Sequence, residues 1–288
     1  MPFGLLRWPI NTANIIVTFK DYIKEYIKIN NLYKQGPHSK YSLDEILNVI
    51  EYVLVNGISW RSLNSPIHLK HFKWQSFYHH FNKFCKMNVF KNVFMNLFNK
   101  YISINKSMKL KYLSVDTSCI KNEYSKDSNF GYIKKKRTSK LSIIVDSNGV
   151  PLSAHLDKGS ISDQELLFKN LEEVNVDLVY INPNNKSKRY MLADKIYDTI
   201  NVRKKIVELN INPIIASNIK NTKDPEKLKM KHLSDHQKII YKKRIIVENT
   251  FSWLFKNRRL SRRYDKNVSS YMGFLYMGFM KIILKRMN

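Results

Sequence analysis

The chain has 288 residues and a formal net charge of +27, from 50 Lys and Arg against 23 Asp and Glu. Its 43% hydrophobic content, with 17 Tyr and 15 Phe, excludes a basic disordered tail and predicts a folded protein with a substantial core. A positive surplus of this size favours a polyanionic partner, either a nucleic acid or an anionic membrane surface. Cys85 and Cys119 are the only cysteines, and no Cys/His cluster has zinc-site spacing, which disfavours redox and zinc functions.

Two apolar stretches bear on the choice between membrane and nucleic acid. The stretch 271–284 is interrupted by Lys281 and is shorter than a usual membrane-spanning helix. The stretch 15–19 is too brief for the core of a signal peptide. The sequence therefore predicts no membrane association and an intracellular protein bound to DNA, in a nucleoid or a nucleus.

The first third of the chain has helical periodicity. An irregular segment is expected over 1–40, and a capping box of Ser42 and Glu45 then starts a helix that stops at Gly57. Aromatic residues three or four apart predict further helices over 74–86 and 89–101. Three short helices with basic faces indicate a helix-turn-helix-like domain over 41–108. The alternative is a helical cap that only packs on the rest of the protein.

From Leu110 the pattern changes to short β-branched runs. A run around Asp116 and two runs that flank Asn148-Gly149, a dipeptide favoured in tight turns, predict a three-stranded meander. The elements expected next are a helix over 163–173, a strand ending at Asp194, a helix over 199–209, a strand over 213–216, a long helix over 238–260, and a closing helix over 271–284 that packs on the sheet. This order predicts an α/β domain over 109–288 with an RNase H-like mixed sheet flanked by helices, in which the first and fourth strands are neighbours.

Three acids lie at positions that this topology would bring together. Asp116 falls on the first strand, Asp194 at the end of its parallel neighbour, and Glu248 on the helix that covers the same face. Carboxylates in such an arrangement can share two divalent ions about 4 Å apart. Oxygen ligands suit Mg²⁺ or Mn²⁺, so these ions are the expected cofactors. Four other acids near element ends, Asp146, Asp157, Asp163 and Asp198, are better explained as caps and turns.

Several motifs, taken in order, resemble those of a known family. They are Val115-Asp116-Thr117, Ile144-Val-Asp146-Ser-Asn-Gly149-Val-Pro151, Leu192-Ala-Asp194-Lys-Ile-Tyr-Asp198, and Arg258-Arg-Leu-Ser-Arg-Arg-Tyr-Asp265-Lys266, preceded by Val53-Leu-Val-Asn-Gly57-Ile-Ser-Trp60-Arg-Ser-Leu63. From about Tyr41 to the C-terminus, the chain is similar to insertion-sequence transposases of the DDE superfamily. The resemblance implies that Asp116, Asp194 and Glu248 bind the metal ions and carry catalysis.

The family's Tyr-x-x-Arg-x-x-x-Glu-x-x-x-x-x-x-Lys signature fits only in part. Tyr241, Arg244 and Glu248 match it, but Phe255 stands at the final lysine position and Lys256 follows one place later. We interpret this departure as a subgroup difference, in which Lys256 is the candidate for the missing lysine.

Basic residues cluster in two places. Nine Lys or Arg fall between Lys242 and Lys266, against two acids. Phosphate binding is the hypothesis for this cluster, and a solvated basic face is the alternative. The second cluster is the run Lys134-Lys-Lys-Arg137, which we expect in a loop between the first two strands. It could contact DNA, form a mobile surface loop, or act as a nuclear-import signal. The residues predicted to contact DNA are Lys134, Lys135, Lys136, Arg137, Tyr241, Arg244, Lys256, Arg258, Arg259, Arg262 and Arg263.

The resemblance predicts the activity and the partners. It implies a transposase that binds double-stranded DNA at the ends of a mobile element, cleaves there with a metal ion, and transfers the strand to target DNA. A homodimer or larger assembly on DNA is expected, because two ends must be handled together. Two alternatives stay open: a metal-dependent nuclease without strand transfer, and a transposase-derived DNA-binding protein without catalysis.

Overall fold

The computed structural model describes residues 18–32, 39–64, 73–104, 109–122, 124, 131–133, 135–174, 188–217 and 233–287. Its centre is a mixed sheet with the strand order β2-β3-β1-β5-β6, in which β4 also pairs with β3 and β7 with β1. The strands are β1 (Tyr112–Asn122), β2 (Gly131–Ile133), β3 (Lys136–Val145), β4 (Pro151–Lys158), β5 (Tyr190–Ala193), β6 (Asn212–Ile215) and β7 (Arg262–Arg263).

The pairing confirms the predicted arrangement of the sheet. Strands β1, β3 and β4 are antiparallel neighbours and form the expected meander. Strand β5 then lies parallel to β1, with Ser114 opposite Leu192, and β6 lies parallel to β5. In the turn after β3, Gly149 has φ of +79°, a conformation that glycine adopts at little cost.

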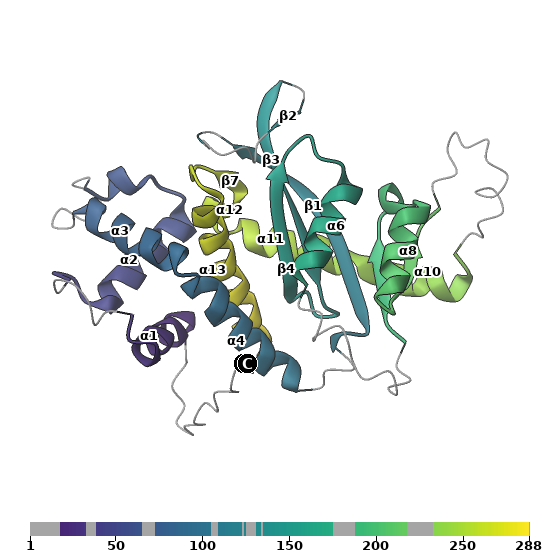
Figure 1. Ribbon diagram of the computed structural model, residues 1–288, viewed down its shortest axis with the longest axis horizontal. Helices are drawn as coiled ribbons and strands as arrows, with labels where there is room; N and C mark the ends of the chain where they lie inside the picture. The colour runs from purple at the N-terminus through teal and green to yellow at the C-terminus, as the bar shows by residue number, and fades with distance from the viewer. Residues whose placement is uncertain are drawn as a thin grey trace.

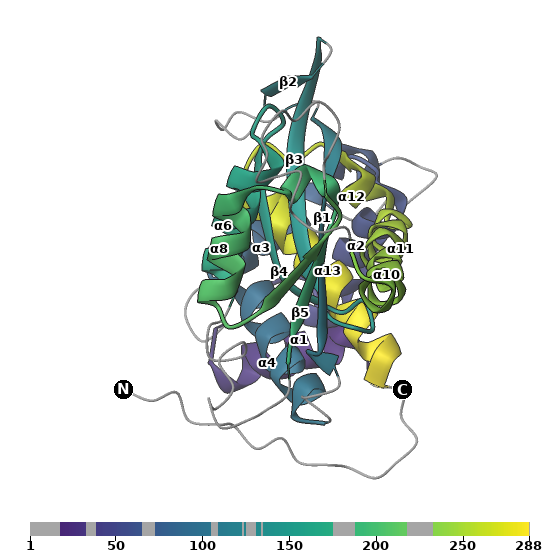
Figure 2. The same cartoon turned by 90° about the vertical axis from the view of Figure 1, so that its right-hand side faces the viewer.

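Helices cover both faces of the sheet. Figure 2 shows α6 (Asp163–Glu173) and α8 (Ile200–Glu208) on one side, and α10 (Asp235–Tyr241) and α11 (Ile245–Phe255) on the other. The predicted single helix over 238–260 is wrong, because the 3₁₀ turn η3 (Lys242–Arg244) separates α10 from α11. The chain also leaves helical geometry at Asn257, which has φ of −79° and ψ of 101°, before the short helix α12 (Arg258–Ser261). Arg244, the last residue of η3, contacts two carboxylates.

The N-terminal part is helical, as Figure 1 shows at its left. It contains α1 (Phe19–Ile29), α2 (Leu43–Asn56), the 3₁₀ helix η1 (Trp60–Asn64), α3 (Trp74–Lys86) and α4 (Val89–Ser103). Ser42 and Glu45 form the predicted capping box, and Gly57 ends α2 with φ of +67°. The helical periodicity of the sequence therefore predicted α2, α3 and α4 correctly.

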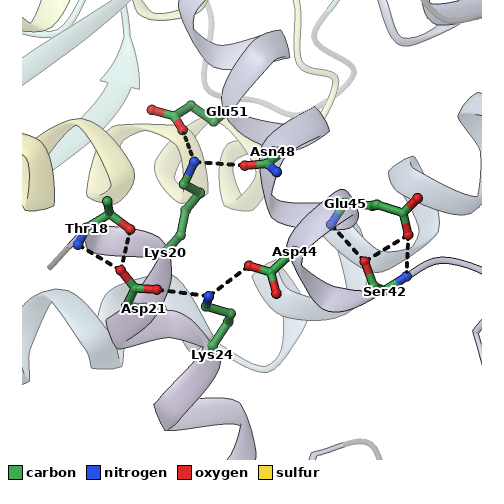
Figure 3. A network of polar contacts seen from close by, with 9 residues as sticks. All are labelled: Thr18, Lys20, Asp21, Lys24, Ser42, Asp44, Glu45, Asn48 and Glu51. Atoms are coloured by element: carbon green, nitrogen blue, oxygen red, sulfur yellow. Dashed lines mark hydrogen bonds and ion pairs between the residues drawn. The ribbon is translucent and has the colours of Figure 1, made fainter. Parts of the chain in front are cut away.

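Helix α1 corrects the expectation of an irregular segment over 1–40. Its buried residues Phe19, Ile23 and Ile27 are spaced by four and face the core. Figure 3 shows how its polar side is joined to α2: Lys20 Nζ lies 2.9 Å from Glu51, and Lys24 Nζ lies 2.7 Å from Asp44. The short apolar stripe between charged residues was overlooked in the sequence.

The last helix, α13 (Val268–Met287), was expected to pack on the sheet, but most of its contacts lie elsewhere. It packs mainly on α4 and α3, and it also touches α1, α11 and α12. The rings of Phe81 on α3 and Phe274 on α13 stack with their centroids 4.2 Å apart. Gly273 matters at this contact because a Cβ there would come within 2.6 Å of Cys85 Sγ. One apolar core consequently runs from α1 through the sheet to α13, and the proposed division into domains over 41–108 and 109–288 stays a prediction.

No helix in the described ranges is both long and apolar enough to span a bilayer.

Candidate active site

The three predicted acids come from three elements that meet on one side of the sheet. Asp116 lies in the middle of β1, and Asp194 follows the last residue of the parallel strand β5. Glu248 lies in the first turn of α11, which packs against β1 and β3. These are the positions predicted from the sequence, whereas the catalytic role of each acid stays a prediction.

Arg244 joins two of these carboxylates. One guanidinium nitrogen, Nη1, lies 3.4 Å from Asp116 Oδ2, and the other, Nη2, donates to Glu248 Oε1 at 2.5 Å. Arg244 precedes Glu248 by four residues, so η3 and α11 present both side chains on the same helical face. The predicted pairing of Arg244 with Glu248 is therefore present, and the additional contact with Asp116 ties η3 to β1.

The charges of the three acids act on one another. Burial is the largest influence on Asp116 and raises its pKa above the ordinary value. The Thr117 backbone N–H and the Arg244 charge oppose this rise, and the negative charges of Glu248 and Asp194 add to it. The three acids therefore lie within electrostatic reach of one another, although Asp194 does not contact the other two. Mutual repulsion of this kind favours a cation between them.

Tyr241 belongs to the same cluster. Burial raises the pKa of its phenol, the Arg244 charge opposes the rise, and the charge of Asp194 adds to it. Its half-buried ring and its place at the end of α10 put it beside the acids. Tyr241 and Arg244 are thus brought together with the acids, as the signature predicts.

The acids keep oxygen atoms available for a metal ion. Asp194 Oδ1 accepts from the Lys195 backbone N–H at 2.7 Å, and Glu248 uses Oε1 for Arg244. The other carboxylate oxygens of Asp194 and Glu248 have no hydrogen-bond partner within the described parts of the chain. Within those same parts, no group of three or more acidic, His or Cys side chains is arranged to hold a metal ion. The donor chemistry fits a hard divalent cation, and Arg244 is the cation that the acids hold in this structure.

Two arginines of the basic cluster are buried, which disfavours their predicted contact with DNA. Arg259 has a side chain only 4% exposed, and its Nε and Nη2 donate to the two oxygens of Asp265 at 3.1 and 2.7 Å. Arg263 is fully buried, and its Nη1 donates to Ser139 at 3.1 Å. The sequence shows that these residues are basic, but their burial results from the chain reversal after Asn257, which no local pattern predicts.

Three other arginines and lysines of the basic cluster are exposed. Lys256, Arg258 and Arg262 lie on the surface at the end of α11, on α12 and on β7. Phe255, which stands in place of the signature lysine, packs partly buried with its ring 5.6 Å from that of Phe251. Lys256 is therefore exposed, whereas Phe255 packs toward the core. Exposure is needed if Lys256 takes the place of the signature lysine.

The second basic run was predicted to lie in a loop, but its described residues lie largely in a β-hairpin. Lys136 and Arg137 are the first residues of β3, and Lys135 occupies the preceding turn with φ of +63°. Lys135 and Lys136 are exposed, and both figures show the hairpin of β2 and β3 extending from one end of the molecule. Lys134 falls outside the described residues. The short strand β2 was missed because it has only three residues.

A buried polar group behind β1 was also missed. The Thr117 hydroxyl donates to Asp163 Oδ1 at 2.5 Å, and Lys140 Nζ lies 3.4 Å from the same oxygen. Tyr197 is buried next to them, and burial followed by the charges of Asp163 and Asp116 raises its pKa well above the usual value. This group connects β1, β3, α6 and the 3₁₀ turn η2 (Lys195–Tyr197) after Asp194. Only the Thr117 that follows Asp116 was a local signal for it.

The other weak candidates have structural partners. Asp146 is buried and accepts from the Tyr101 hydroxyl at 2.7 Å and from the backbone of its own turn. Asp198 pairs with Arg203 at 2.7 Å, and Asp157 pairs with Lys169 at 2.7 Å. These contacts support the interpretation of these acids as turn and packing residues.

The mixed sheet with parallel β1 and β5, two aspartates on those strands and a glutamate on the covering helix define an RNase H-like fold of the kind found in transposases. The family described as "Transposase DDE domain" matches residues 109–276, and the chain belongs to this family. A Burkholderia cepacia protein assigned as the transposase for insertion sequence element IS402 is 27% identical over 140 residues, which cover 49% of this chain and 60% of that protein. The match thus spans less than two thirds of this relative.

A solved transposase structure has a similar fold. The piggyBac transposase in a synaptic complex with hairpin DNA matches with a TM-score of 0.53 and 12% identity, over 95% of this chain and 72% of that chain. The catalytic domain of Mos1 mariner transposase aligns over 68% of this chain and 91% of that chain at 15% identity, and its TM-score of 0.27 is too low to support a structural argument. At these identities the likeness concerns the fold alone.

Proposed function

We propose that this protein is a DNA transposase that binds the ends of a mobile element, cleaves a phosphodiester bond there, and joins the freed 3′ end to target DNA. The observation that carries the proposal is the contact of Arg244 with both Asp116 and Glu248, with Asp194 in electrostatic reach of them, on the fold and in the family just described. The net charge of +27 supports a polyanionic substrate.

Asp116, Asp194 and Glu248 are the residues that would hold Mg²⁺ or Mn²⁺, which we expect as two ions. Such ions, when bound, activate an attacking oxygen and stabilise a leaving oxygen. The Thr117 and Lys195 backbone amides each fix one oxygen of an aspartate, so the direction of both carboxylates is set before any ligand arrives. A bound cation would compete with Arg244 for Asp116 and Glu248, and the released guanidinium is then able to pair with a phosphate of the DNA.

The two steps use the same residues. In the first step a water oxygen bonds to phosphorus and the bond from phosphorus to O3′ breaks, which leaves a free 3′-hydroxyl. In the second step that 3′ oxygen bonds to a phosphorus of target DNA, and a target strand is displaced as the leaving group. Recognition of the element end lies outside the acids in this proposal, with the helices of 41–108 as its candidate. A homodimer or larger assembly on DNA is part of the same proposal.

The test compares the protein with its Asp116→Asn and Glu248→Gln variants on duplexes that carry the terminal sequences flanking its gene, with Mg²⁺ or Mn²⁺. We expect cleavage and joining by the unaltered protein, and a loss of at least about 10²-fold in each variant, with duplex binding in EDTA retained. Cleavage without joining would replace the proposal with a nuclease. If the unaltered protein cleaves no better than Asp116→Asn, the enzymatic proposal fails and a DNA-binding protein without catalysis remains.

A further inference from the structure

An open groove of about 730 Å³ begins at the start of β1 and reaches η3 and α11. Its lining includes Lys109, Lys111, Tyr112, Ser114, Asn148 and Lys243. Three of these residues are lysines, and no acid lines the groove. Lys243 belongs to the basic cluster between Lys242 and Lys266, whereas the other five come from segments more than thirty positions away in the chain and were not predicted as a site.

The three lysines differ in how they are held. Lys109 Nζ donates to the Tyr101 carbonyl at 2.5 Å and lies 3.7 Å from the centre of the Tyr101 ring, so it also has a structural role. Lys111 and Lys243 are exposed, and both ammonium groups lie near the Tyr112 ring, at 5.5 and 4.1 Å from its centre. A tyrosine face attracts the two ammonium groups and positions them without an acidic partner. Their charge therefore remains available to an anion.

The groove lies next to the candidate active site, because both are built on β1 and η3. Side chains alternate along a strand, so Tyr112, Ser114 and Asp116 share one face of β1. On the opposite wall, Lys243 immediately precedes Arg244, which contacts Asp116. A chain of phosphates that reaches Asp116 along this face would consequently pass Ser114, Tyr112 and the lysines.

Ser114 supplies an independent indication of a ligand. It is only 1% exposed and lines the groove, and its hydroxyl has no hydrogen-bond partner among the residues that the structure describes. Buried hydroxyl groups are usually hydrogen-bonded, and one left without a partner at a groove wall is suited to a ligand oxygen. Phosphate oxygens are acceptors, and a serine hydroxyl donates to them.

We propose that this groove binds the sugar–phosphate backbone of duplex DNA next to the reacting phosphodiester, with Lys111 and Lys243 paired to phosphates and the Ser114 hydroxyl donating to a phosphate oxygen. The placement next to the reacting bond rests on the proposed function, whereas DNA binding in the groove does not. A double-stranded DNA partner is favoured over an acidic peptide because the lysines line a long open groove that leads to a site for phosphodiester chemistry.

The test measures duplex binding in EDTA, so that its readout does not depend on catalysis. A fluorescent 30-base-pair duplex is titrated with the protein at several salt concentrations, and the Lys111→Ala/Lys243→Ala variant is compared with Lys204→Ala/Lys205→Ala. The control removes the same charge from exposed residues of α8, on the other side of the sheet. Each lost phosphate contact lowers the slope of log K against log salt by about 0.9. We expect a slope reduced by about 0.9 to 1.8 and binding weakened by roughly eightfold to sixtyfold at 0.1 M salt, for the groove variant only.

Crosslinking then locates the DNA. Lys243→Cys carrying a photoreactive benzophenone, in a Cys119→Ser background, should crosslink to the duplex, and Lys204→Cys treated in the same way should not. Equal slopes for the groove variant and the unaltered protein, or equal losses in both double variants, would overturn the proposal. So would a groove-dependent preference for an acidic peptide over the duplex. If the protein binds DNA through the groove but never cleaves, the proposed function fails and the groove assignment stands.

Discussion

Replacing Arg259 should reveal a structural cation within a cluster that looks like a DNA-binding surface. Arg259 makes two hydrogen bonds to Asp265 and a third to the Ile58 carbonyl at 3.0 Å, and both side chains of the ion pair are almost fully buried. Arg259→Ala leaves the Asp265 carboxylate buried without its counter-charge, which costs about 3–5 kcal/mol. For a chain of this size we expect the melting temperature to fall by roughly 6–10 °C.

Arg258→Ala is the matched control, because it removes the same charge from the adjacent exposed residue. We expect its melting temperature to change by no more than about 1–2 °C, since substitutions of this kind usually stay within about 0.5 kcal/mol. The double variant Arg259→Met/Asp265→Leu should recover much of the lost stability, because it removes both buried charges together.

The assays are thermal unfolding followed by circular dichroism and the salt dependence of duplex binding. Arg259→Ala should lower the melting temperature and leave the salt slope of the folded protein unchanged. Arg258→Ala should leave the melting temperature nearly unchanged and, if Arg258 contacts a phosphate, reduce the salt slope. The reasoning is refuted if Arg259→Ala unfolds at the same temperature as Arg258→Ala. A reduced salt slope with unchanged stability would restore Arg259 to the DNA-binding surface.

Two further predictions concern pH. Burial raises the pKa of Asp146 from 3.8 to about 6, so its contribution to stability is complete below pH 3.8 and is lost as the pH rises through 6. Relative to Asp146→Asn, the protein should therefore lose up to about 3 kcal/mol between pH 3 and pH 7 in urea unfolding, and parallel curves would contradict this. Arg244→Ala should raise the pKa of Asp116 further, because the Arg244 charge lowers it in the intact protein. The acidic limb of the pH profile for cleavage should then move to higher pH, and it should stay in place in Arg203→Ala, whose guanidinium pairs with Asp198.

Local patterns predicted the main strands of the sheet, though not the short strands β2 and β7, and the positions of the acids. The alternating run around Asp116, the turn at Gly149 and the apolar run before Asp194 are strong signals over short distances, and the sheet follows from them. Helix α2 was similarly readable from its capping box and from Gly57. These features depend on residues only a few positions apart.

The wrong predictions concern features that depend on contacts between residues far apart in the sequence. The continuous helical periodicity over 238–260 contains no residue that breaks a helix, and the interruption at Lys242–Arg244 goes with the contact between Arg244 and Asp116, 128 positions away. The burial of Arg259 depends on Asp265 and on Ile58, 201 positions away. Likewise, nothing in the sequence of 271–284 specifies whether its apolar face meets the sheet or the N-terminal helices.

The placement of α13 has a consequence for the synthesis of this protein. The apolar faces of α3 and α4 are covered by the helix that leaves the ribosome last among the described elements. A nascent chain that has completed the N-terminal helices and the sheet still exposes Phe81, Phe90 and Phe94, which α13 covers through Phe274, Gly273 and Phe279. A premature stop before Val268 therefore yields an aggregation-prone polypeptide that chaperones bind and proteases degrade. This holds even though Asp116, Asp194 and Glu248 have already been translated.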